Sequence, residues 1–198
     1  MFIQRAVFQP IPERVPALRE ALLALNTPAN PVTVLRRIWG GLEFIVLGAH
    51  ESLAAYEDWY RRFTPDPKLQ GLYAAVSWEL WEQTVARPSG PPPKFTARFT
   101  YHAASLPAMR ELRPLVEEHR IALSAAGAAF SVAIAASGAG QAIHAINAFQ
   151  SLAEWEWFRA TGLASSATLA FAQKIAPLLA KPAEPPEVFE ILATPARA

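Results

Sequence analysis

The sequence predicts an α+β fold made of two tandem ferredoxin-like units, each with the order β-α-β-β-α-β. Two observations support this prediction. The stretch GLEFIVLGAHESLAAYEDWYRR at 41–62 reappears without a gap as GQAIHAINAFQSLAEWEWFRAT at 140–161. The helix start VPALRE at 15–20 recurs as LPAMRE at 106–111, so several landmarks repeat in the same order. Duplication therefore organises the chain.

The first half shows the signals of each element in turn. Phe2 to Phe8 mixes aromatic and β-branched residues, and Pro10 and Pro12 end this strand. Ser52 is suited to cap a helix. The pattern predicts a helix at 13–26, strands at 32–39 and 42–49 around a Gly40-Gly41 turn, a helix from 52, a short helical piece near 69–75, and a strand at 76–84.

The second half repeats this order after RPSGPPP at 87–93, a stiff segment that we interpret as a linker. It predicts domains at 1–86 and 94–198. The elements expected after the linker are strands at 95–101, 130–137, 141–149 and 188–192, helices starting at 106 and after Ser151, and an extra helix at 165–179.

Composition excludes several classes of function. Eighteen basic and 17 acidic residues give a formal net charge of +1, so we expect no nucleic acid partner. The chain has no cysteine, which excludes disulfides and thiolate chemistry. The start MFIQRAVF lacks signal-peptide features, and no apolar run is long enough to cross a membrane. We expect a cytoplasmic protein without a membrane partner.

A sheet with both helices on one face leaves its other face bare, so the two units need each other as cover. We expect them to pack sheet to sheet as one intramolecular pseudo-twofold α+β barrel, present as a monomeric pseudo-dimer or a homodimer. Arg5 and Arg98 recur in the first strands, and Glu79 and Glu190 recur in the last strands. We expect each Arg to pair with its Glu across the sheet.

The arrangement resembles the dimeric α+β barrel superfamily, and within it NIPSNAP-type and antibiotic-biosynthesis-monooxygenase-like proteins. The segment YEDWYRRFTPDPKLQGL, Tyr56 to Leu72, is similar to NIPSNAP proteins in its aromatic, Arg-bearing helix followed by Asp-Pro. The second half has WEWFRATGLASS instead, with neither a second Arg nor Asp-Pro. The resemblance implies a cavity for a small apolar or aromatic molecule and chemistry without a metal or flavin cofactor.

Differences between the two copies indicate candidate site residues, because shared positions are explained by the fold. Leu53, Tyr56 and Trp59 match Leu152, Trp155 and Phe158, and we interpret both sets as core. Histidine can act as a general base near neutral pH, although a lone histidine is more often structural. The catalytic candidates are His144, His102 and Arg36; the ligand-binding candidates are Trp39, Trp78, His50 and Asn147.

His144 and Asn147 lie three positions apart in one strand, which places them on opposite faces and counts against a joint site. His119 follows Glu117-Glu118 without the spacing of a metal-binding helix, so we expect it on a solvated face. No residues are assigned to a metal.

Two hypotheses of different class follow. The first is a cofactor-independent oxygenase, isomerase or cyclase that works without a metal on a small apolar or aromatic molecule in the cavity of the barrel. The second is a non-catalytic binding or scaffold protein whose barrel is filled by side chains. The size of the cavity and the residues on its wall distinguish the two.

Overall fold

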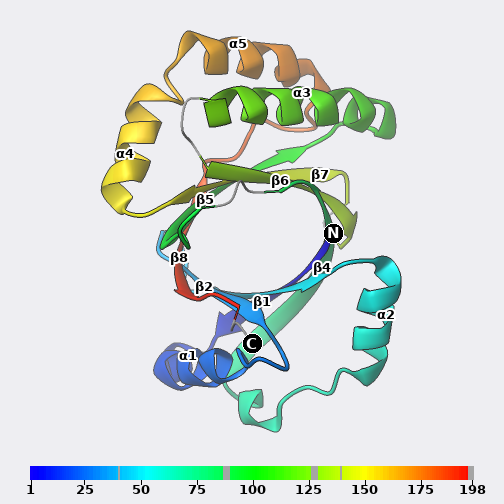
Figure 1. Ribbon diagram of the computed structural model, residues 1–198, viewed down its shortest axis with the longest axis vertical. Helices are drawn as coiled ribbons and strands as arrows, with labels where there is room; N and C mark the ends of the chain where they lie inside the picture. Colours follow the sequence, from blue (N-terminus) through cyan, green and yellow to red (C-terminus); the bar gives the residue numbers. More distant parts are fainter. Residues whose placement is uncertain (40, 87–89, 126–128, 139, 196–198) are drawn as a thin grey trace. The chain divides into compact units, whose positions relative to one another are not determined.

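The computed structural model describes residues 1–39, 41–86, 90–125, 129–138 and 140–195. The strands are antiparallel neighbours in the hydrogen-bonded order β1-β3-β2-β8-β5-β7-β6-β4, which closes as a barrel. This confirms the predicted α+β fold class (Figure 1). Contacts divide the chain into two compact units: Met1–Glu82, Ala136–Gly138 and Phe189–Ala198 form the first, and Gln83–Ala135 with Ala139–Val188 form the second.

The elements of the first unit follow the predicted order. They are β1 (Phe2–Pro10), the 3-10 turn η1 (Pro12–Arg14), α1 (Val15–Ala24), β2 (Val32–Arg37), β3 (Phe44–His50), α2 (Leu53–Arg62), the 3-10 turn η2 (Pro67–Leu69) and β4 (Tyr73–Val85), whose last residues belong to the second unit. Gly40 of the predicted turn lies outside the described residues, and β2 and β3 form the expected antiparallel pair.

One predicted element of this unit is wrong. The helical piece expected near 69–75 is a single 3-10 turn, η2, and β4 begins at Tyr73. The Asp66 side chain accepts a hydrogen bond from the Lys68 backbone N–H at 2.9 Å, which stabilises only this one turn. Gly71 then adopts φ +74°, a left-handed conformation that ends the turn.

The sheet of the first unit has an apolar cluster on each face, because side chains alternate along a strand. On the helix-covered face, Ala6 and Phe8 of β1 pack with Leu18 and Leu22 of α1. On the other face, Val7 packs in a cluster with Leu35, Ile45 and Phe189. These two clusters fix the register in which β1 pairs with β3 and β4.

The second unit repeats the order and adds a helix. It contains β5 (Phe95–His102), α3 (Leu106–Ala125), β6 (Ala129–Ser137), β7 (Ala142–Phe149), α4 (Leu152–Thr161), α5 (Ser166–Ile175), the 3-10 turn η3 (Ala176–Leu178) and the start of β8 (Glu187–Ala193). The extra helix predicted at 165–179 is confirmed as α5 and η3. Part of the predicted linker, 87–89, lies outside the described residues.

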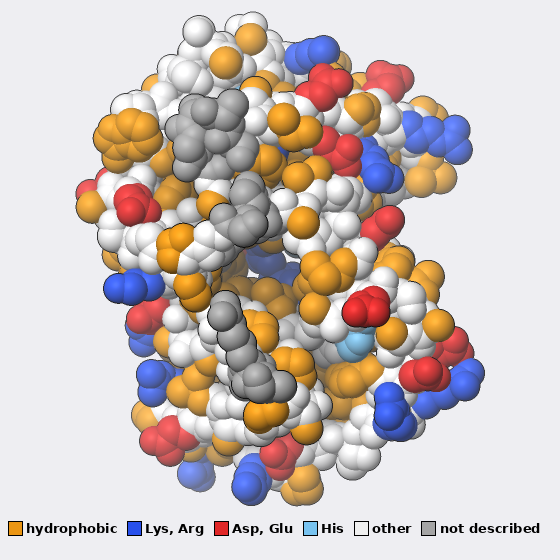
Figure 2. Space-filling view, viewed as in Figure 1, with side chains coloured by type: hydrophobic (Ala, Val, Ile, Leu, Met, Phe, Trp, Pro, Cys, Tyr) orange, Lys and Arg blue, Asp and Glu red, His pale blue; other side chains and the backbone are white. Residues whose placement is uncertain are grey.

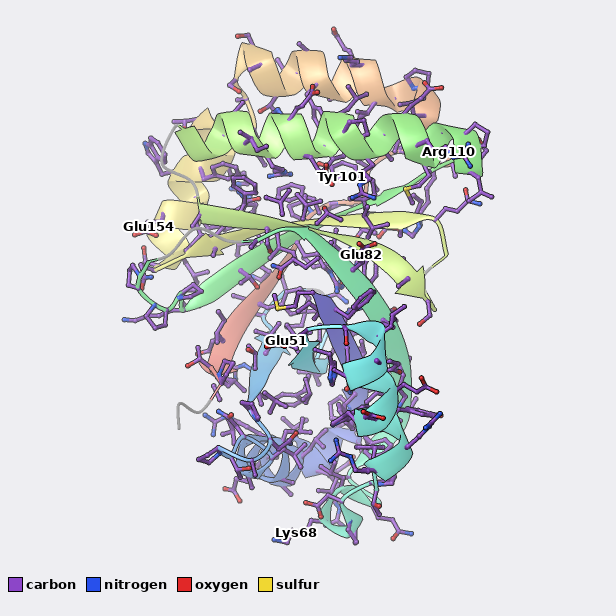
Figure 3. All side chains as sticks on the ribbon, turned by 45° about the vertical axis from the view of Figure 1, so that its right-hand side comes forward. Glu51, Lys68, Glu82, Tyr101, Arg110 and Glu154 are labelled. Carbon is purple, nitrogen blue, oxygen red and sulfur yellow. The ribbon has the colours of Figure 1, made fainter. Side chains whose placement is uncertain are left out.

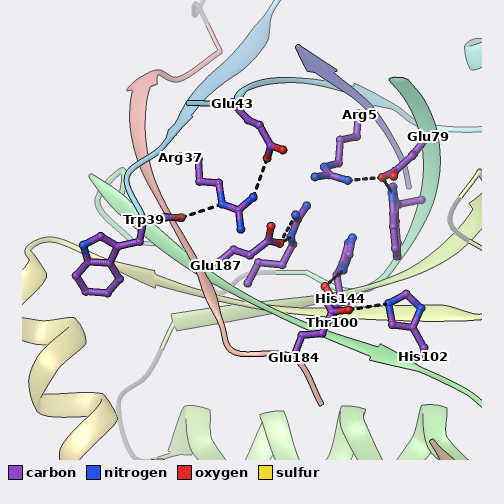
Figure 4. Close-up of polar contacts among 12 residues, drawn as sticks. Arg5, Arg37, Trp39, Glu43, Glu79, Thr100, His102, His144, Glu184 and Glu187 are labelled. Atoms are coloured by element: carbon purple, nitrogen blue, oxygen red, sulfur yellow. Dashed lines mark hydrogen bonds and ion pairs between the residues drawn. The ribbon is translucent and has the colours of Figure 1, made fainter. Parts of the chain in front are cut away.

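Of the two predicted Arg–Glu pairs, the one between Arg5 and Glu79 is confirmed (Figure 4) and the other is wrong. Arg5 faces Glu79 in the pairing of β1 with β4, and their side chains form an ion pair. Arg98 pairs instead with Glu187, its Nε donating to Oε2 at 2.8 Å. Glu190 faces Arg36 in the pairing of β8 with β2 and is bound by it. The predicted Arg98–Glu190 pair is wrong because this part of β8 pairs with the first unit's β2.

The prediction that both helices bury an aromatic face is right for α4 and wrong for α2. In α4, Trp155 and Phe158 are buried, as expected, whereas Leu152 is 37% exposed and is not core. In α2 no residue is buried, and Leu53 is 54% exposed. The core interpretation is therefore confirmed for Trp155 and Phe158 and wrong for α2.

The surface is mixed in charge, with basic and acidic side chains interspersed over the face shown in Figure 2. No helix in the described parts of the chain is long and apolar enough to cross a membrane.

Candidate functional site

A cavity of about 530 Å³ lies within the second unit. The helices α3 and α5 cover the sheet there (Figure 1). Its wall is formed by β5, the last part of α3, α5, η3 and the segment 179–183. Most of the wall is apolar, with Leu163, Phe171, Ile175 and Leu179 among the lining residues. A volume and lining of this kind are typical of small-molecule sites.

Local sequence explains how the two helices come to form this wall. In α5, the Ser165 side chain caps the helix by accepting from the Thr168 backbone N–H at 3.2 Å. In α3, Leu112, Val116 and Arg120 are all buried and follow one another at intervals of four residues, so they form one stripe. Arg120 therefore takes the place of an apolar residue on the buried face of α3.

Arg120 is the polar centre of the wall and is only 2% exposed. Its Nη1 donates to Oδ1 of Asn147 at 2.7 Å, and its Nη2 donates to the hydroxyl of Tyr101 at 3.3 Å. The guanidinium carbon lies 5.0 Å from the centroid of the Phe99 ring, a cation–π distance. Figure 3 shows Tyr101 beneath α3. Arg120 is thus held in place by neutral groups.

No acidic side chain among the described residues forms an ion pair with Arg120, and its buried Nε has no hydrogen-bond partner. The lining residues include a second cation, Lys181, which pairs with Glu184. They include no Asp or Glu. The cavity therefore has a positive wall within apolar surroundings.

His119 precedes Arg120 and also lines the cavity. Its ring stacks on Phe171, with centroids 4.1 Å apart and planes at 6°. Burial, together with the positive charge of the neighbouring Arg120, lowers the pKa of His119 to about 4. His119 is therefore neutral at pH 7. The expectation that it lies on a solvated face is wrong, because α5 packs Phe171 against it.

The structure brings one predicted site residue, Asn147, into the Arg120 network, where it is fully buried. His144 lies on the other face of β7, as the odd spacing predicts, and its Nδ1 is 3.1 Å from the Thr100 hydroxyl (Figure 4). His102 lies at the end of β5, its Nε2 3.9 Å from a carboxylate oxygen of Glu184. Neither histidine lines the cavity.

The other predicted residues belong to the first unit and do not line this cavity. Arg36 binds Glu190 at 2.5 Å on an exposed part of the sheet. Trp39 is 47% exposed, and its backbone oxygen accepts from Arg37 Nε at 2.9 Å. These two residues are therefore engaged in surface contacts.

His50 and Trp78 belong to an aromatic cluster around α2. The His50 ring lies 5.4 Å from the rings of Tyr56 and Trp59, and burial lowers the pKa of His50. Trp78 lies 5.3 Å from Phe63. The cluster is half-exposed, and its members pack on one another.

Sequence reasoning missed Arg120, Tyr101 and His119, although one signal for Arg120 was present. A charged residue stands one turn beyond Leu112 and Val116, where the helical stripe predicts an apolar side chain. An arginine that interrupts such a stripe is either paired or functional. Tyr101 stands at the position that corresponds to Phe8 in the first half, and it differs from Phe8 by a hydroxyl group. Comparison of the two halves could therefore have indicated Tyr101 as well.

Comparison with known proteins places the fold. No protein-family model matches the sequence, and no curated protein matches it. Solved structures do match. An anthrone oxidase-like protein superposes with a TM-score of 0.73 at 12% identity, over 98% of this chain and 92% of that one. A ferredoxin-fold protein from Listeria monocytogenes, described as related to antibiotic biosynthesis monooxygenases, gives 0.54 at 9% identity, over 98% and 96%.

A heme-degrading enzyme from Listeria monocytogenes gives a TM-score of 0.53 at 8% identity, over 96% of this chain and 99% of that one. At such identities the likeness shows the fold alone. The chain thus has the ferredoxin-like α+β barrel fold of these proteins.

Proposed function

We propose that the cavity of the second unit binds a small, mainly apolar or aromatic molecule and orients one of its oxygen atoms against Arg120. The observation that supports this most is a buried guanidinium on the wall of an apolar cavity of about 530 Å³. The names of the structural neighbours, which include an anthrone oxidase-like protein and a heme-degrading enzyme, accord with a small-molecule role.

Each part of the wall has a distinct task in this proposal. Arg120 and the Tyr101 hydroxyl offer hydrogen bonds to the ligand oxygen, and Phe171 and Ile175 contact its apolar body. Because Arg120 is itself buried, a hydrogen bond from it is stronger than it is in solvent. His119, neutral at pH 7, contributes a hydrogen bond rather than a charge.

If the bound molecule is transformed, we propose a cofactor-independent oxygenase, isomerase or cyclase reaction at this cavity. Arg120, Tyr101 and His119 then replace His144, His102 and Arg36 as the residues proposed to contact the substrate. The finer resemblance to NIPSNAP proteins is also a proposal, and it rests on Tyr56 to Leu72 in the first unit. The alternative of a non-catalytic scaffold with a side-chain-filled barrel is not tested by this cavity, because the cavity lies between α3, α5 and the helix-covered face of the sheet and not inside the barrel.

A thermal-shift screen against small aromatic and quinone-like compounds tests the proposal. A ligand at 100 times its dissociation constant stabilises the native state by about 2.7 kcal/mol, which corresponds to a rise in Tm of roughly 5–10 °C for a protein of this size. Oxygen uptake and product analysis with each binding compound then separate an enzyme from a carrier.

The control uses two alanines of α5. Both are exposed, but Ala172 lines the cavity and Ala170 does not. Ala172→Trp fills the cavity and is expected to abolish the shift, and Ala170→Trp is expected to preserve it. A screen without any binding compound, or equal binding by Ala172→Trp, would contradict the proposal.

A further inference from the structure

The charges around the cavity indicate what class of molecule it takes, and this inference rests on the proposed function. The lining residues contribute the cations Arg120 and Lys181 but no carboxylate. Lys181 already has Glu184 as its counter-charge. Arg120 has neutral partners only, Asn147 and Tyr101.

A buried cation without a counter-charge is costly, since its hydration is lost and nothing of opposite sign replaces it. The acidic residues nearest in sequence do not supply that charge. Glu117 binds Arg113 at 3.1 Å on the same helix, and Glu118 is exposed. The charge of Arg120 is therefore uncompensated within the described protein.

The hydrogen bonds left unmade at this centre are all donors. The Nε–H of Arg120 and the side-chain nitrogen of Asn147 are buried and have no acceptor. The Tyr101 oxygen accepts from Arg120, which leaves its own proton to be donated. A centre with surplus donors and a positive charge is matched by an oxygen that is both an acceptor and an anion.

We propose that the ligand is an organic monoanion, a carboxylate or phenolate on an apolar body, with its charged oxygen against Arg120 and Tyr101. The body lies among Leu163, Phe171, Ile175 and Leu179, which line the cavity. The anion supplies the counter-charge that the protein does not provide.

Isothermal titration calorimetry at pH 8 with ligands of matched shape tests this. We compare 2-naphthoate with the neutral 2-naphthamide, and 4-nitrophenolate with the neutral 4-nitroanisole. A charge-assisted hydrogen bond corresponds to about a 10- to 100-fold gain in affinity, so at least one anion is expected to bind that much more tightly than its neutral partner. If the carboxylate binds more tightly than its amide, the preferred group is a carboxylate; if the phenolate binds more tightly than its methyl ether, it is a phenolate.

Three variants locate the preference. Arg120→Met keeps the length of the side chain and removes the charge, and it is expected to bind anion and neutral partner equally. Tyr101→Phe removes only the hydroxyl and is expected to reduce the preference severalfold. Arg110→Met removes an exposed cation of the same helix (Figure 3) and is expected to retain the full preference.

The outcomes separate this inference from the proposed function. If neutral partners bind as tightly as anions in the wild type, the anionic class is wrong. If Tyr101→Phe and Arg120→Met both retain the full preference, the placement of the anion against these two residues is wrong. In both cases the cavity still binds small molecules, so the proposed function stands. If no compound of either charge binds, the proposed function itself fails. Tyr101→Phe keeps the test decisive if Arg120→Met does not fold.

Discussion

Helices α2 and α4 are copies of one sequence pattern, and yet they differ in burial. Both begin at a serine, Ser52 or Ser151, whose side chain accepts from a backbone N–H at 3.1 and 3.2 Å, respectively. Trp155 of α4 is 1% exposed, whereas no residue of α2 is buried. The same local signal thus makes the same helix but not the same interface.

The strands beneath the two helices account for the difference. Trp155 packs on Phe99 and Phe149, with ring centroids 6.2 and 5.5 Å away. The aligned positions in the first unit are Ala6 and His50. A small residue and a partly polar ring give the aromatic side chains of α2 less apolar surface to cover, so they pack on one another instead.

The second unit also has elements without a counterpart in the described part of the first. α3 spans twenty residues against ten for α1, and α5 follows α4. The added length of α3 brings His119 and Arg120 over the sheet, and α5 completes the cavity wall. The candidate site is therefore formed by features that the described part of the first unit lacks.

The largest expected effect is a difference in unfolding free energy between substitutions in α4 and in α2. Trp155→Ala should lower the free energy of unfolding by about 3–5 kcal/mol, because it leaves a cavity in the core. Trp59→Ala removes only partly exposed ring contacts and should cost about 1–2 kcal/mol. Denaturant unfolding measures both values, and equal losses would break the comparison.

A smaller effect concerns the arginine–glutamate pairs. Arg98→Ala should lower the free energy of unfolding by about 3 kcal/mol, because it removes the ion pair of Arg98 with the mostly buried Glu187 carboxylate. Arg36→Ala disrupts an exposed pair and should cost about 0.2–1 kcal/mol. Thermal or denaturant unfolding measures which of the two substitutions causes the larger loss of stability. If Arg36→Ala were the more damaging change, the assigned role of each pair would be wrong.

The last effect is a pH dependence that arises at His119 of the second unit. The pKa of folded His119 is about 4, below its ordinary value of about 6.5. Between these values the unfolded chain binds the extra proton, so stability is fully present above about pH 6.5 and falls as the pH drops towards 4. His119→Gln should flatten this part of the stability profile. An unchanged profile in the variant would contradict the burial of His119 against Phe171.

Sequence reasoning succeeded where the signal was local or repeated. The α+β class, the serine caps, the hairpin strands, the extra helix and the Arg5–Glu79 pair all follow from such signals. It failed for Arg98, whose partner is Glu187, because strand position does not specify the register in which distant strands meet. The candidate site was predicted only through Asn147, and the interrupted stripe Leu112–Val116–Arg120 was the signal not used.

By itself, the sequence determined the order of the elements and the ends of the helices, since a serine cap or an apolar period acts within a few residues. Tertiary structure decided which aromatic face is buried and which side chains surround Arg120. Those outcomes depend on packing between β5, α3 and α5, which meet only after the chain has folded. The candidate site is a product of that packing.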